Sequence, residues 1–175
     1  MQAEKENKWY VGRTRARQEK KIKLRLNELG VENYIPLRPE VHVYANGRRK
    51  KVEVPLLPNL MFIRIAPDDR FALLSQLGAL WMQYVVDRFT GSSMVVPDKQ
   101  VEDFIRLVES RDATLAVEDL QLRRGDRIRV TEGAFAGMEG ECLELRGKKR
   151  VVLRIEGVAA LSVEVPARSL EKIKA

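Results

Sequence analysis

The chain has 175 residues, of which 45% are hydrophobic and 33% charged, and its formal net charge is +7. This composition is typical of one or two small folded domains and argues against a largely disordered chain. No apolar run reaches the about 18 residues of a membrane-spanning helix, and the charged residues 1–7 lack the apolar core of a secretory signal, so we expect a cytoplasmic protein. With one cysteine, Cys142, and one histidine, His42, the chain cannot form an internal disulfide or the usual Cys/His zinc sites.

The excess positive charge lies in the first 55 residues, which hold 14 Lys and Arg against 7 Asp and Glu, whereas residues 56–175 hold 18 of each kind. A basic excess confined to one region is expected where a protein meets phosphates. A solvated basic face that serves solubility is the alternative.

The first elements are a strand and an amphipathic helix. Aromatic and β-branched residues predict a strand over residues 8–14. Helical periodicity follows over residues 15–29, where Ile22, Leu26 and Leu29 share one face. Basic side chains occupy another sector of this helix or its entry, where free backbone N–H groups and the helix dipole favour phosphate. They are Arg15, Arg17, Lys20, Lys21 and Arg25.

A β-hairpin is predicted next, because Asn46-Gly47 separates alternating runs at residues 40–44 and 51–54. Its tip carries four cations that could contact nucleic acid or stay solvated: Arg48, Arg49, Lys50 and Lys51. We interpret His42 as an ordinary strand residue, since no nucleophile with a base accompanies it.

Residues 60–65 predict a central strand, because five of the six side chains are apolar and both faces must be covered. The Pro58-Asn59 pair marks a turn before this strand. Leu56, Leu57 and Leu60 then lie at the end of the sheet, where we expect them to form an exposed apolar surface for a partner.

The remaining elements complete two domains. Helices at residues 70–77 and from residue 97 to about 110, with strands at 81–86 and 94–96, finish a small α/β layer domain. Trp81 could stack on a base, although a core position is the commoner role of such a tryptophan. Residues 111–121 lack a pattern and are interpreted as a linker.

The segment from Leu122 onward predicts five short strands, as in a small β-barrel. Gly133, Gly137 and Gly140 permit close turns, but neither GxxxxGK[ST] nor GxGxxG is present, so the glycines do not form a phosphate loop. An enzyme is not expected, because no nucleophile and base pair or paired carboxylates stand out. No cofactor or metal is expected either.

Residues 125–140 resemble a KOW motif, which occurs in certain ribosomal proteins and in NusG transcription factors. Together with the opening Lys8-Trp9-Tyr10-Val11 and the run of residues 55–63, they make residues 8–175 similar to the NusG family, and especially to its specialised paralogues of the RfaH and UpxY kind. This resemblance implies an α+β fold. An NGN-like α/β sandwich, an antiparallel-rich sheet with helices on its faces, would span residues 8–110, a linker 111–121, and a five-stranded, SH3-like KOW β-barrel 122–175.

The resemblance also implies a function, a monomeric transcription elongation or antitermination factor. The clamp helices of RNA polymerase's largest subunit would bind an apolar patch of Tyr10, Leu56, Leu57, Pro58, Leu60 and Phe62. The non-template DNA strand would bind Arg15, Arg17, Gln18, Lys20, Lys21 and Arg25. The KOW domain would offer Phe135, Gly133 and Gly137 to a ribosomal protein or a termination factor. The alternative is a KOW-type RNA-binding or ribosome-associated protein.

Overall fold

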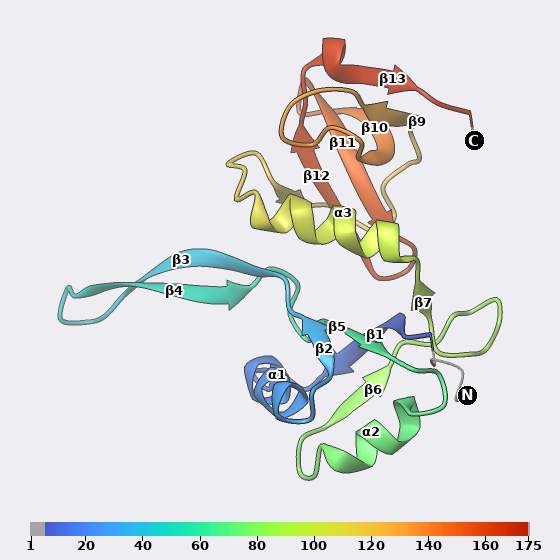
Figure 1. Cartoon of the computed structure of the whole chain (residues 1–175). Coiled ribbons are helices and arrows are strands. Elements are labelled where there is room, and N and C mark those ends of the chain that lie inside the picture. Colours follow the sequence, from blue (N-terminus) through green and yellow to red (C-terminus); the bar gives the residue numbers. More distant parts are fainter. Residues whose placement is uncertain (1–5, 175) are drawn as a thin grey trace. The chain divides into compact units, whose positions relative to one another are not determined.

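The computed structural model describes residues 6–174, and the chain divides into two compact units, Met1–Val101 and Glu102–Ala175 (Figure 1). The sequence places the domain boundary at residues 110 and 111. The division between the two compact units falls inside helix α3, Asp98–Glu109, which begins directly after Pro97. The last two turns of α3 therefore belong with the second unit.

The first unit is built on an antiparallel sheet in the order β2-β5-β1-β6. Its strands are β1 (Lys8–Thr14), β2 (Glu32–Tyr34), β5 (Leu60–Ile65) and β6 (Met82–Tyr84), and the short β7 (Val95–Val96) pairs with β1. The run of residues 60–65 is confirmed as a central strand, because β5 pairs with β1 on one side and β2 on the other.

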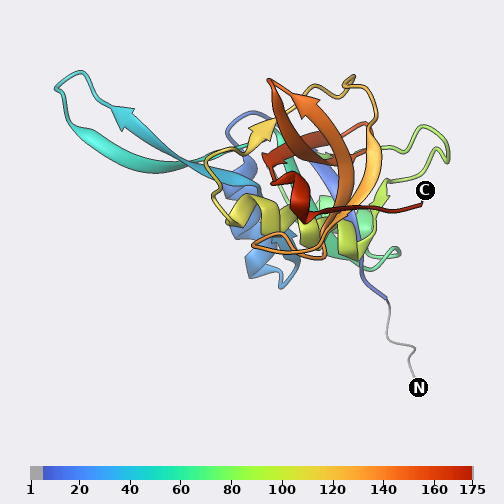
Figure 2. The same cartoon turned by 90° about the horizontal axis from the view of Figure 1, so that it is seen from above.

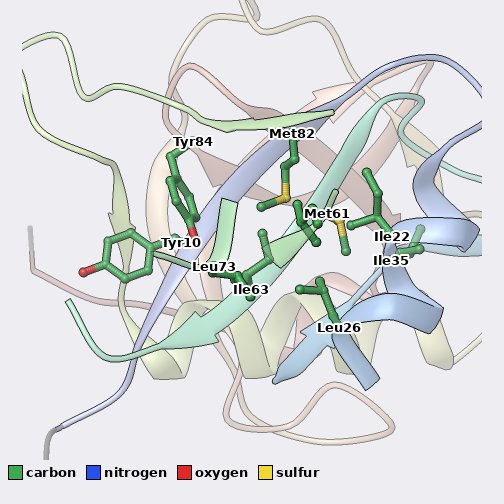
Figure 3. Close-up of a cluster of buried hydrophobic side chains, with 10 residues drawn as sticks. Tyr10, Ile22, Leu26, Ile35, Met61, Ile63, Leu73, Met82 and Tyr84 are labelled. Carbon is green, nitrogen blue, oxygen red and sulfur yellow. The ribbon is translucent and has the colours of Figure 1, made fainter. Parts of the chain in front are cut away.

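Helices α1 (Glu19–Glu28) and α2 (Arg70–Gln76) supply the core on one face of this sheet. Figure 3 shows the side chains that converge there: Tyr10, Ile22, Leu26, Ile35, Met61, Ile63, Leu73, Met82 and Tyr84. The predicted buried stripe of the first helix is confirmed, since Ile22 and Leu26 are fully buried.

The first helix begins at Glu19 and not at residue 15 as the periodicity predicts. Arg17 has a φ of 65°, which a right-handed helix does not accommodate. Residues 15–18 therefore form a turn that precedes the helix.

Strands β3 (Leu37–Val43) and β4 (Arg49–Pro55) form a separate two-stranded sheet. This confirms the hairpin predicted from Asn46-Gly47. In Figures 1 and 2 the hairpin extends away from the main sheet of the first unit.

The second unit contains one antiparallel sheet in the order β13-β9-β10-β11-β12-β8, which fits the expected small barrel. The strands predicted from residue 122 onward are all present. They are β9 (Asp126–Val130), β10 (Glu139–Leu145), β11 (Lys148–Ile155), β12 (Ala159–Glu164) and, after a short 3-10 helix at Ala167–Ser169, β13 (Leu170–Lys172).

A sixth strand comes from the segment expected to be a linker. Strand β8 (Ala116–Val117) pairs with β12, and the Glu118 N–H donates to the Ala160 carbonyl at 2.8 Å. The Arg150 guanidinium, only 3% exposed, donates to the Thr114 carbonyl and to the Ser162 hydroxyl. A buried charge needs such partners, so this segment is part of the folded unit.

Candidate nucleic-acid and protein interface

The loop of residues 56–59 between β4 and β5 is fixed by backbone hydrogen bonds. The Leu56 N–H donates to the Pro36 carbonyl at 2.8 Å, and the Asn59 carbonyl accepts from the Thr14 N–H at 3.0 Å. Asn59 takes a left-handed φ of 63°, which asparagine tolerates better than most residues. The Asn59 N–H donates to Glu19 Oε1 at 2.8 Å.

Glu19 is therefore the link between this loop and the first helix. Glu19 is only 4% exposed, although it is the first residue of α1 and most of the residues around it in the sequence are basic. Glu19 is not among the residues predicted from the sequence to form the site. One signal was present, because Glu19 is the only carboxylate among seven Lys and Arg between Arg13 and Arg25. A lone acid in such a run indicates a specific partner.

The basic turn before α1 lies against Trp81. The Arg15 guanidinium carbon is 5.6 Å from the centre of the Trp81 ring, within range of a cation–π contact. Gln18 Oε1 accepts the Trp81 backbone N–H at 3.2 Å. Trp81 itself is 38% exposed, so it lies at the surface beside the cations and not in the core.

The cations expected to bind DNA do not all have the same surroundings. Arg15, Arg17, Lys20 and Lys21 are exposed. Arg25 is half-buried, and its guanidinium donates to the Gln76 carbonyl at 3.1 Å and to Glu28 at 3.0 Å. The turn and the first helical turn therefore bring together the expected residues except Arg25, whose guanidinium is engaged at the end of α2. Lys20 also has a partner, because its Nζ donates to the Glu53 carbonyl at 2.5 Å.

The expectation of an exposed apolar patch is wrong for most of its members. Leu56, Leu57 and Leu60 are 8%, 8% and 4% exposed, and Phe62 is fully buried in the central strand. Only Pro58 of the loop is exposed. Apolar side chains leave water wherever the fold allows, and the hydrogen bonds of the 56–59 loop hold it against the first unit.

Tyr10 is also a core residue and not an exposed one, as a surface patch would require. It is 3% exposed and packs edge-on against Tyr84, with ring centres 5.6 Å apart. Tyr84 donates from its hydroxyl to the Arg70 carbonyl at 2.9 Å, and burial raises the pKa of its phenol. Tyr10 lies on the sheet face that α1 and α2 cover, so its ring is not available to a partner.

The loop expected to bind a partner of the KOW domain spans residues 133–137. Gly133 and Gly137 are exposed and have φ values of 83° and 82°, so they permit the tight turn there. Phe135 is only 7% exposed, which corrects the expectation that its ring is displayed. The Arg106 guanidinium donates to the Ala134 and Ala136 carbonyls at 2.6 and 2.7 Å and fixes the loop.

Two further observations concern other classes of site. Within residues 6–174, no group of three His, Cys, Asp or Glu side chains is placed to hold a metal ion. The helices in this part of the chain are also too short or too polar to cross a membrane.

Comparison with known proteins identifies the family of the chain. The family described as transcription termination factor NusG matches residues 7–122, more than half of the chain. The transcription termination/antitermination proteins NusG of Streptococcus pyogenes serotypes M1 and M3 (strain SSI-1) are each 28% identical over 157 residues, which cover 81% of this chain and 82% of the relative.

Among solved structures, the chain resembles one described as "Domain interaction in Thermotoga maritima NusG", with a TM-score of 0.51. The match covers 96% of this chain and 98% of that one, at 20% sequence identity. This likeness shows a shared fold over nearly the full length. The chain therefore belongs to the NusG family of transcription termination and antitermination factors.

Proposed function

We propose that the chain is a transcription elongation or antitermination factor that binds the clamp of RNA polymerase and the non-template DNA strand at adjoining surfaces of its first unit. The observation that carries the proposal is the hydrogen bond between Glu19 and Asn59. It joins the start of the basic helix to the loop that matches the family's polymerase-binding segment.

The basic turn suits a single DNA strand for three reasons. Arg15, Arg17, Lys20 and Lys21 supply exposed positive charge, and free N–H groups at the start of α1 add to it. Trp81 offers a partly exposed ring beside them. Cations that follow the backbone and an aromatic ring that stacks on a base are the usual means of binding single strands.

The clamp contact requires a change of exposure. Leu56, Leu57 and Leu60 are buried. If the clamp binds through them, these side chains must first become exposed and are then buried again against the clamp. Uncovering one leucine costs about 1.5–3 kcal/mol, which an apolar clamp surface would restore in the complex. Pro58, already exposed, would be the first point of contact.

The mechanism is one of binding without chemistry. A protein that holds the clamp and the displaced strand at once binds the closed form of the polymerase better than the open form, and so shifts the population away from opening and pausing. The KOW domain, through the loop of Gly133, Phe135 and Gly137, would recruit a ribosomal protein or a termination factor.

The test places a charge at the proposed clamp contact without touching a buried side chain. Pro58→Glu should weaken co-purification with RNA polymerase elongation complexes at least about tenfold, because a carboxylate opposes burial in an apolar interface. Pro166→Glu, at an exposed proline of the second unit, is the matched control and should bind normally.

Two outcomes would count against the proposal. One is wild-type binding by the Pro58 variant, which contradicts the clamp contact. The other is co-sedimentation of the wild-type chain with ribosomal subunits in the absence of transcription, which supports the alternative of a KOW-type, ribosome-associated RNA-binding protein.

A further inference from the structure

The β3–β4 hairpin has no buried face over most of its length. Every residue from Arg38 to Lys51 is exposed. Val41 and Val43 are 52% and 58% exposed, and Tyr44 is 42% exposed. A two-stranded hairpin is marginally stable without a surface to pack against, so exposed apolar and aromatic side chains at this end favour a contact with a partner.

The charge of the hairpin indicates what kind of partner fits. Residues 37–55 contain five Lys and Arg against two Glu. The ion pair between Arg38 and Glu40, at 3.8 Å, lies toward the base. Four consecutive cations, Arg48 to Lys51, lie at the tip and are exposed. A polyanion matches this distribution.

The register places these cations on both faces of the ribbon. Arg49 and Lys51 lie opposite Val43 and Val41 and share one face with them. Lys50 lies opposite His42, on the other face. The His42 ring packs edge-on against the next side chain of that face, Tyr44, with centres 4.9 Å apart.

The turn holds this arrangement in a fixed geometry. The Tyr44 N–H donates to the Arg48 carbonyl and the Gly47 N–H to the Tyr44 carbonyl, both at 2.9 Å. Asn46 Oδ1 accepts the Arg48 N–H at 3.0 Å, and Gly47 has a φ of 79°. This is the three-residue loop with a left-handed glycine that closes many hairpins. Cations held in place lose less conformational entropy on binding.

We propose that the β3–β4 hairpin inserts its tip into the major groove of duplex DNA, a contact separate from the single-strand and clamp contacts proposed above. The major groove is about 12 Å wide and about 8.5 Å deep and admits a two-stranded ribbon. Lys50 and Arg48 then approach one row of phosphates and Arg49 and Lys51 the other.

The shape of the ribbon favours DNA over RNA. The major groove of an A-form RNA duplex is too deep and narrow for side chains to reach its floor. A single strand has no groove at all, so a contact with two rows of phosphates is specific to the duplex. The hairpin should therefore contribute to the binding of duplex DNA and not to that of an RNA duplex.

The experiment compares two lysine pairs that lie on hairpins in the full chain. Lys50→Gln with Lys51→Gln removes two tip cations. Lys148→Gln with Lys149→Gln removes two exposed lysines at the β10–β11 turn and changes the net charge equally. Fluorescence anisotropy then measures affinity for a 20-base-pair DNA duplex, the RNA duplex of the same sequence and one DNA strand alone, over a range of salt.

We expect the Lys50/Lys51 variant to lose about tenfold in affinity for duplex DNA, and the slope of log affinity against log salt to fall by about 1.8, because two phosphate contacts disappear. The Lys148/Lys149 variant should stay within about twofold of wild type, since its lysines are not expected to meet the duplex. Equal losses in the two variants would mean that net charge alone attracts DNA, and would overturn the proposal. An equal loss on the RNA duplex or on the single strand would also overturn it.

A further variant tests whether the ordered turn of the hairpin is needed. Gly47→Val retains every cation and meets open space, but strains the left-handed turn, so it should also weaken duplex binding. No polymerase is present in these measurements, so failure of the clamp proposal does not affect them. Unchanged duplex affinity of the Gly47 variant would contradict insertion of an ordered tip.

Discussion

Glu19 shows how one side chain can decide where a surface lies. Its carboxylate is buried and accepts the Asn59 N–H, so the loop of residues 56–59 and the start of α1 are held together. Around it, Arg15, Arg17 and Lys21 are exposed, whereas Lys20 donates to the Glu53 carbonyl and Arg25 to Gln76 and Glu28. The sequence could predict the basic residues, but not the contact between Glu19 and Asn59, since its two partners are 40 residues apart.

Removal of the Glu19 acceptor should destabilise the first unit. Glu19→Ala leaves the Asn59 N–H without its partner, and we expect a loss of about 1–2 kcal/mol in the free energy of unfolding, measured by urea titration. Glu19→Gln keeps an acceptor oxygen in place and should lose less than half as much. If the two variants proved equally stable, the hydrogen bond would not be what holds the loop.

At the scale of secondary structure, the sequence predicted what depends on local pattern. The apolar run of β5, the Asn46-Gly47 hairpin and the buried face of α1 were all visible in spacing and composition, and all three are confirmed. Strand β8 was not predicted. Its two residues have no pattern of their own, and they become a strand only because β12 offers an edge to pair with.

The candidate site likewise has features that the sequence could predict and features that it could not. Residue type located the cations before α1, and the structure brings four of them together at the surface. Exposure was harder to predict, because whether a leucine at the end of a strand is covered depends on segments far away in the chain. Leu56, Leu57 and Phe135 were expected at the surface and are buried for that reason.

Glu118 provides a test that the segment after α3 is part of the second unit. Burial tends to raise the pKa of its carboxyl, but hydrogen bonds from Arg146 and Ser162 and the charges of Arg146 and Arg150 outweigh burial, so the pKa is lowered. The folded form thus holds the proton less tightly than the unfolded chain. The stabilisation is complete above the unfolded pKa of about 4.5 and is lost as the pH falls through the folded value.

Glu118→Gln should therefore flatten the dependence of stability on pH. We expect the variant to be less stable than wild type at pH 7 and to approach it as the pH falls below about 4.5, as judged by urea unfolding at each pH. The control Glu144→Gln changes an exposed carboxylate on β10 and should run parallel to wild type. Identical pH profiles for wild type and the Glu118 variant would mean that this segment is a free linker.

At the scale of the whole molecule, the chain carries its candidate surfaces on separate units. The basic turn, the 56–59 loop and the hairpin belong to the first unit, and the loop fixed by Arg106 belongs to the second. Each unit has its own sheet, and the first has its own core of side chains from β1, β5, β6, α1 and α2. This arrangement allows the proposed binding to polymerase and the proposed recruitment of a partner to be tested separately by truncation.

A fragment of residues 1–110 should still bind RNA polymerase elongation complexes, because it contains every residue proposed for the clamp and the DNA strand. It should lose any coupling of transcription to a ribosome or termination factor, which we assign to the second unit. Pull-down on stalled elongation complexes measures the first property, and a coupled transcription–translation assay measures the second. If the fragment binds polymerase and still couples transcription to a ribosome or termination factor, partner recruitment belongs to the first unit. If the fragment folds but does not bind polymerase, part of the polymerase contact belongs to the second unit.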